Sequence, residues 1–173
     1  MSSVERAQSV AISSLLDELE WMVAFARGNN IEWIANDKGI LENFGYLNLY
    51  IFRNYIVKKM RRKLKRRTRA YGLVGSTATD EVTYRTEVLL ESLSALLGAN
   101  TYFFPYNEPL WIDCKAFAVL AQFIYTPVNH DTRIKQFLRD RVPNLTNFVR
   151  RMKKTTSGPI GTSRVDDVEK KML

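Results

Sequence analysis

The segment at residues 110–125 constrains the fold most, because it is apolar on nearly every side. It reads Leu-Trp-Ile-Asp-Cys-Lys-Ala-Phe-Ala-Val-Leu-Ala-Gln-Phe-Ile-Tyr, and its polar side chains are confined to Asp113, Lys115 and Gln122. A helix that is hydrophobic all round belongs in the interior of a domain and not on its surface. The segment therefore predicts a central helix with other helices packed around it.

Helical periodicity extends over most of the chain, and no segment shows the clean alternation of a strand. Apolar residues recur at helical spacing over 8–27, 46–70, 80–97, 131–140 and 143–153, and Gly98 stands where a left-handed C-cap would end the third of these. A short amphipathic turn is expected at 31–36, with loops at 39–45 and 99–109. We predict an all-α protein, a single helical bundle of six or seven helices. Its organisation is an N-terminal extension at 1–11, a helical domain at 12–154 and a polar tail at 155–173.

Positive charge is concentrated in one short run. The chain carries a net charge of +8, and residues 58–69 contain basic residues without a single acidic one. Leu49, Phe52, Ile56, Met60 and Leu64 form an apolar stripe through this region, so the run is predicted to be the polar side of a docked helix, with Met60 and Leu64 buried. The candidate partner- or anion-binding residues are Lys58, Lys59, Arg61, Arg62, Lys63, Lys65, Arg66, Arg67 and Arg69.

Several partners would suit such a run. An acidic protein surface, anionic phospholipid headgroups and RNA phosphates all attract clustered Lys and Arg. A merely solvated helix face is the alternative, although an unbroken basic run is unusual for one. Nothing in the chain resembles a helix-turn-helix, so we do not expect DNA as a partner. The strongest contacts are expected from Arg61, Arg62, Lys65, Arg66 and Arg69.

Few residues are available for catalysis or for metal binding. The chain has one cysteine, Cys114, and one histidine, His130, which excludes an internal disulfide and a Cys- or His-rich metal site. Cys114 is expected to be a small buried core residue, and His130 a neighbour of a turn. No apolar run has the length of a membrane span. We expect no catalytic residue, no metal and no cofactor, in a soluble or peripheral protein.

The order of motifs between Leu89 and Met152 carries a family resemblance. A helix ending in Leu97-Gly98 is followed by the aromatic turn Tyr102-Phe103-Phe104, by Pro109, by Asp113 in the apolar segment, and by Pro143-Asn144-Leu145 at the start of the last helix. This pattern resembles the C-terminal helical domain of glutathione S-transferase-like proteins, in particular the failed axon connections and metaxin branch. The resemblance implies a structural capping role for Asp113. The family's Ser or Thr three residues earlier is replaced here by Leu110.

The resemblance also implies a preceding thioredoxin-like domain, which carries the glutathione site in this superfamily. The first dozen residues are too few for a βαβ unit, so we expect a non-catalytic accessory subunit of a larger protein complex. Its expected partners are other protein subunits, and its expected location is mitochondrial, peripheral to a membrane, with the cytoplasm as the alternative. Two other functions remain open: an enzyme half that needs a separate thioredoxin-like partner, and an RNA-associated subunit of a ribonucleoprotein.

Overall fold

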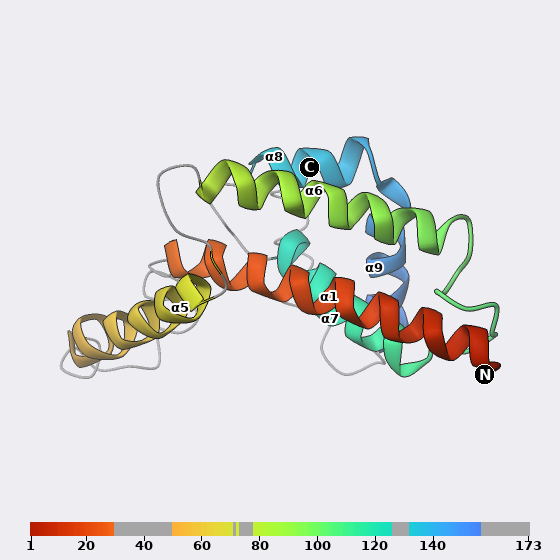
Figure 1. Ribbon diagram of the computed structural model, residues 1–173, viewed down its shortest axis with the longest axis horizontal. Helices are drawn as coiled ribbons and strands as arrows, with labels where there is room; N and C mark the ends of the chain where they lie inside the picture. Colours follow the sequence, from red (N-terminus) through yellow and green to blue (C-terminus); the bar gives the residue numbers. More distant parts are fainter. Residues whose placement is uncertain (30–49, 71, 73–77, 126–131, 157–173) are drawn as a thin grey trace.

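The computed structural model of the 173-residue chain describes residues 1–29, 50–70, 72, 78–125 and 132–156 (Figure 1). Regular structure within these residues is entirely helical, which confirms the all-α prediction. The elements are α1 (Ser3–Asn29), a π-helical turn η1 (Phe52–Val57) that leads into α5 (Lys58–Ala70), α6 (Ala78–Leu97), α7 (Trp111–Tyr125), α8 (Thr132–Asp140) and α9 (Pro143–Thr156).

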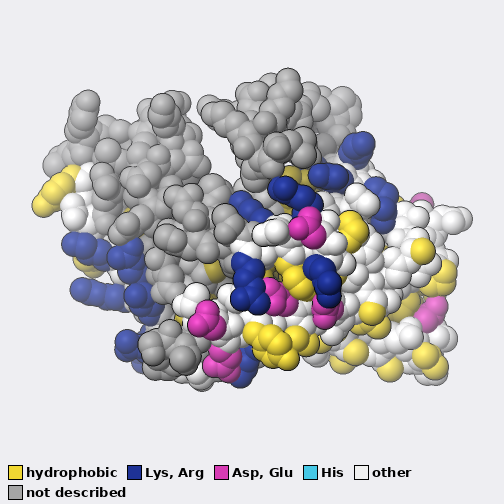
Figure 2. All heavy atoms as spheres, turned by 90° about the horizontal axis from the view of Figure 1, so that it is seen from above, with side chains coloured by type: hydrophobic (Ala, Val, Ile, Leu, Met, Phe, Trp, Pro, Cys, Tyr) yellow, Lys and Arg dark blue, Asp and Glu magenta, His cyan; other side chains and the backbone are white. Residues whose placement is uncertain are grey.

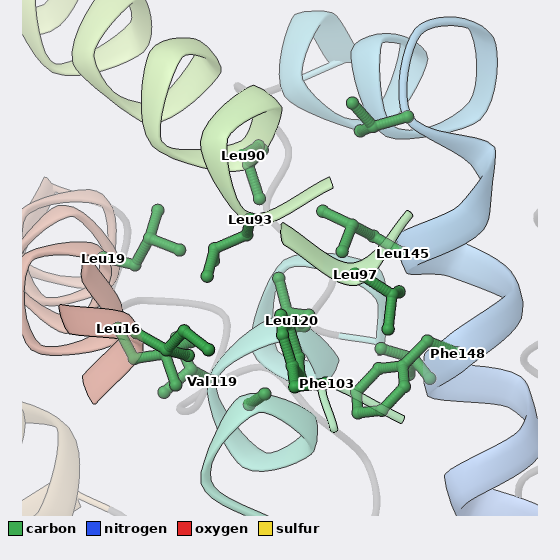
Figure 3. Close-up of a cluster of buried hydrophobic side chains, with 14 of the residues drawn as sticks. Leu16, Leu19, Leu90, Leu93, Leu97, Phe103, Val119, Leu120, Leu145 and Phe148 are labelled. Carbon is green, nitrogen blue, oxygen red and sulfur yellow. The ribbon is translucent and has the colours of Figure 1, made fainter. Parts of the chain in front are cut away.

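One hydrophobic core joins five of these helices. Figure 3 shows leucines of α1, α6, α7 and α9 meeting around Phe103 and Phe148, and α8 adds Ile134 and Leu138. Phe148 of α9 is completely buried, and its ring meets that of Phe103 edge to face at a centroid distance of 5.5 Å. The core therefore also includes Phe103 and Phe104 of the loop between α6 and α7.

Helix α7 is less enclosed than its composition predicts. Ile112, Ala116 and Leu120 are fully buried against the core, whereas the indole of Trp111 is 57% exposed. Cys114 and Ala118 are also exposed on this side. The prediction of burial all round is therefore wrong for one face, because α1 and α9 cover the others.

Helix α1 begins well before the residue predicted from periodicity. Ser2 is its N-cap, and the Glu5 amide donates a hydrogen bond of 3.2 Å to the Ser2 hydroxyl. In return, the Ser2 amide donates one of 2.6 Å to the Glu5 carboxylate. This is a capping box, which satisfies two amides at a helix start reciprocally. Residues 3–11 are thus the first turns of a long helix, and the Ser-x-x-Glu spacing was the signal that could have located its start.

Glu5 also joins α1 to the loop before α7, and this contact gives a pH-dependent prediction. The Tyr106 hydroxyl donates to the Glu5 carboxylate at 3.1 Å, and the Ser2 amide together with this hydroxyl lowers the pKa of Glu5 below its ordinary value. A lowered native pKa stabilises the fold above the unfolded-state pKa, and the contribution is lost as the pH falls through the native pKa. We expect Glu5→Gln to destabilise the protein at neutral pH, and the deficit to shrink on acidification in a series of urea unfolding curves. A deficit that grows towards low pH would contradict this assignment.

The other helix ends follow the sequence closely. Gly98 has φ of +56° immediately after α6, as predicted for a left-handed C-cap. Helix α9 begins at Pro143 and continues to Thr156, so the first two residues of the predicted tail are helical. The predicted turn at 31–36, the loop at 39–45, His130 and residues 157–173 lie outside the described residues.

Candidate functional site

The helix that carries the basic run changes its hydrogen-bond pattern just before the run. Phe52–Val57 form a π-helical turn, with hydrogen bonds reaching one residue further than in an α-helix. The extra residue rotates the two parts of the helix relative to each other. Val57 and Thr68 are buried, whereas Ile56 and Met60 are each 40% exposed. The prediction that Met60 is buried is therefore wrong, and Leu64 is half-buried.

The side of α5 that faces the protein is small and separate from the main core. Val57 packs with Phe52 and Leu64 in a cluster of its own. The Thr68 hydroxyl donates to the backbone oxygens of Leu64 and Lys65, both at 3.1 Å, so this buried polar group is satisfied. Helix α5 packs chiefly on α1, as Figure 1 shows at the end of the molecule away from the N-terminus.

Two of the nine candidate cations lie on or beside this packed side. Arg61 follows Val57 by one turn and is half-buried. The Arg67 guanidinium lies over the Trp21 ring of α1, 5.3 Å from its centroid, in a cation–π contact. The expectation that Arg61 is among the principal contact residues fits its half-burial poorly, because the side chain lies on the same side as Val57 and Thr68.

The other seven cations are exposed and we call them the outer basic face; Arg67 is exposed as well, but its guanidinium is engaged by the Trp21 ring. Figure 2 shows Lys and Arg side chains gathered at the end of the molecule where Figure 1 places α5. The outer basic face consists of Lys58, Lys59, Arg62, Lys63, Lys65, Arg66 and Arg69.

Carboxylates of the described residues do not neutralise this surface. Ion pairs in the rest of the described chain join Arg85 to Glu81, Lys115 to Asp17, and Arg133 to Glu87, all outside α5. Like charges three or four residues apart on one helix oppose its formation by a few tenths of a kcal/mol per pair. A polyanion placed against the outer basic face would relieve this repulsion, so the chemistry that the surface supports is anion binding.

An exposed apolar surface adjoins the outer basic face. Tyr50 and Tyr55 are 68% and 65% exposed, and Ile51 is 49% exposed. The Lys59 ammonium lies 5.9 Å from the centroid of the Tyr55 ring, so the two surfaces meet there. Sequence reasoning missed this neighbour of the basic run, because it assigned Ile56 and Met60 to the docked stripe.

Asp113 is a second prominent polar residue, and its carboxylate holds backbone amides of the protein itself. Its side chain is completely buried. One carboxylate oxygen accepts the Leu110 amide at 2.8 Å, and the other accepts the Phe103 amide at 2.9 Å. The Leu110 contact is the return half of a capping box whose hydroxyl half is missing, as expected for a capping residue. Asp113 additionally anchors the aromatic loop, which sequence reasoning did not foresee.

Asn144 has a similar structural role where α6 and α9 meet, because it also binds backbone groups of two segments. Its amide nitrogen donates to the backbone oxygens of Ser94 and Gly98, at 2.9 and 3.1 Å. Its oxygen accepts from the Ser94 hydroxyl at 2.7 Å and from the Leu145 amide at 3.0 Å. One side chain therefore caps the end of α6 and the start of α9 together, a role that its place in a sequence motif could not reveal.

The remaining candidates for chemistry do not form a site within the described residues. Cys114 is exposed, so the expectation of a buried core cysteine is wrong. Within the described part of the chain, no three His, Cys, Asp or Glu side chains lie together as a group that could hold a metal ion. No helix among those described is long and apolar enough to cross a membrane.

Comparison with known proteins identifies part of the helical domain. Residues 86–152 match the family model described as glutathione S-transferase, C-terminal domain. The matched stretch runs from the middle of α6 to the middle of α9 and includes both Asp113 and Asn144, whereas α1 and α5 lie outside it. No curated protein and no solved structure matches the chain.

Proposed function

We propose that the protein is a non-catalytic interaction module, an accessory subunit of a larger assembly, which docks onto a polyanionic surface through the outer basic face. The observation that carries the proposal is the arrangement of α5. The seven cations of the outer basic face are exposed on a helix whose opposite side packs on α1. This arrangement presents a basic surface that faces away from α1.

The hydrogen bonds of Asp113 and Asn144 in the matched domain support a structural role for these two residues. Both oxygens of Asp113 and the whole side-chain amide of Asn144 are engaged by the protein itself. The resemblance of the 89–152 motifs to the failed axon connections and metaxin branch supports membership of that branch. It also favours a mitochondrial location peripheral to a membrane, with the cytoplasm as the alternative.

Charge reversal tests the proposal. We expect the quadruple change of Lys59, Arg62, Lys63 and Arg66 to Glu to reduce recovery of stoichiometric partners in native affinity purification about 100-fold, because like charges brought together across an interface cost several kcal/mol. The assembly would be sized by chromatography and its subunits identified by mass spectrometry.

A matched control makes the same change of net charge on another surface. Arg139, Arg141, Arg150 and Lys154 are exposed on or beside α8 and α9, and reversing all four is expected to leave the assembly intact. Equal loss in both variants, or in neither, would contradict docking through α5. Retention on immobilised glutathione after a thioredoxin-like partner is supplied would favour the enzyme-half alternative instead.

A further inference from the structure

We infer that the outer basic face, together with the exposed apolar residues beside it, binds the surface of an anionic phospholipid bilayer. The inference rests on the proposed function, in that α5 is the docking element, and it names the partner. The observation behind it is the juxtaposition of two exposed surfaces on one helix. One holds seven cations, and the other holds Tyr50, Ile51, Tyr55, Ile56 and Met60.

The two surfaces meet where the π-helical turn leads into α5. Tyr55 is 65% exposed, the Lys59 ammonium lies over its ring, and Ile51 stands one turn before Tyr55. The exposed side of the helix therefore passes from apolar and aromatic residues into basic ones along its axis.

This combination is what a bilayer interface accommodates. Helices that lie at a membrane surface insert an apolar side at the boundary of headgroups and acyl chains, and their Lys and Arg side chains reach the lipid phosphates. Tyrosine is favoured at the same depth, because its ring is apolar and its hydroxyl is polar. Long basic side chains lay their methylene groups along apolar surface while the charge stays in water.

Two other partners fit the observations less well. RNA would use the cations and could stack bases on Tyr50 or Tyr55, but it gives exposed Ile51 and Ile56 no apolar surroundings. Protein interfaces are depleted in lysine, and four of the seven cations of the outer basic face are Lys58, Lys59, Lys63 and Lys65. A plane of many equivalent phosphates suits a broad lysine-rich face better than a specific protein surface.

Vesicle sedimentation tests the inference directly. We expect the purified protein to sediment with phosphatidylcholine vesicles that contain phosphatidylserine, and to stay in solution with phosphatidylcholine alone. Each basic residue removed is expected to weaken partitioning about fivefold, the usual contribution of one cation near an anionic surface. The quadruple Glu variant of the outer basic face should not sediment, whereas the control variant of α8 and α9 should still bind.

A second variant separates insertion from charge attraction. Ile51, Tyr55 and Ile56 changed together to Ser keep every cation, and we expect binding about tenfold weaker or more, because burial of even part of a large apolar side chain is lost. Its residual binding should be abolished by salt more readily than that of the wild type. Far-UV circular dichroism shows whether the helix persists in the variant.

A fluorescent probe reports depth at one residue. In a Cys114→Ser background, Ile56→Cys carries an environment-sensitive fluorophore, and Arg139→Cys carries it in the control. We expect the emission of the probe at residue 56 to shift to the blue and to intensify with phosphatidylserine vesicles, and that of the control to stay unchanged. The same emission from both positions, or no change at residue 56, would overturn insertion.

The outcomes separate this inference from the proposed function. If the quadruple Glu variant loses its partners but the wild type ignores anionic vesicles, the bilayer inference fails and docking through α5 stands. If the protein binds polyuridylate in solution but does not bind vesicles, the outer basic face is assigned to RNA. If vesicles bind while charge reversal leaves the purified assembly intact, assembly through α5 fails and lipid binding stands.

Discussion

Replacing Asp113 with alanine is expected to lower the free energy of unfolding by about 3–5 kcal/mol, because two backbone amides lose a buried, charged acceptor. The Leu110 and Phe103 amides both donate to this fully buried carboxylate, and the Phe103 contact is itself buried while the Leu110 contact is partly buried. Asp113→Asn preserves the shape but turns an NH2 group towards one of the amides, so we expect it to recover only part of the loss. Urea denaturation followed by circular dichroism measures both variants.

Glu108 provides a control for this prediction within the same connection. It is exposed close to the start of α7, and Glu108→Ala removes a carboxylate at a cost expected to stay within about 0.5 kcal/mol. If Asp113→Ala were as mild as Glu108→Ala, the carboxylate would not be what anchors the loop and the helix start.

Replacing Phe148 with alanine is expected to cost about 3–5 kcal/mol, the range for deleting a large aromatic ring from a packed core. The ring is completely buried and meets Phe103 edge to face, so its removal leaves a cavity between α9 and the loop before α7. Phe148→Leu fills most of that space and should cost less than about 1.5 kcal/mol. Thermal and urea unfolding of both variants check the difference.

The residue before it offers a matched control on the same helix. Asn147 is exposed, so Asn147→Ala should change stability by no more than about 0.5 kcal/mol. Equal effects of Phe148→Ala and Phe148→Leu would mean that loss of the aromatic contact, and not the cavity, sets the cost.

The elements that the sequence predicted best have strong local signals at their ends. Gly98 ends α6 and Pro143 begins α9, each within a residue of its predicted position. These residues act through backbone geometry alone, which a single sequence reveals. The early start of α1 was missed because periodicity weakens where exposed residues dominate, although Ser2 and Glu5 carried the signal.

The burial pattern of α5 could not be derived from its periodicity. A stripe through Phe52, Ile56, Met60 and Leu64 assumes 3.6 residues per turn throughout, and the π-helical turn breaks that assumption. The concentration of charge was evident from composition, but which cations are exposed depends on the position of α1. Arg67 over Trp21 is a contact between distant parts of the chain, and no local pattern encodes it.

In the matched domain, too, some features were predictable from the sequence and others were not. Its motifs were visible in the sequence, and residues 86–152 match the glutathione S-transferase C-terminal family model. The contacts of Asn144 were not visible, because three of its four hydrogen bonds reach across to Ser94 of α6 and to Gly98 just after it. Motifs of this kind locate a residue, and only the fold assigns its contacts.

The small apolar cluster beneath α5 affects where the folded protein opens locally. Among the described residues, the apolar cluster beneath α5 consists of Leu64 with Val57 and Phe52 of η1, whereas α6, α7 and α9 share a large core. Segments with few buried contacts open at lower free energy than the molecule as a whole. We therefore expect α5 to exchange its amide hydrogens before α6, α7 and α9. A bound polyanion slows that exchange, because a ligand that binds only the closed form raises the free energy of opening.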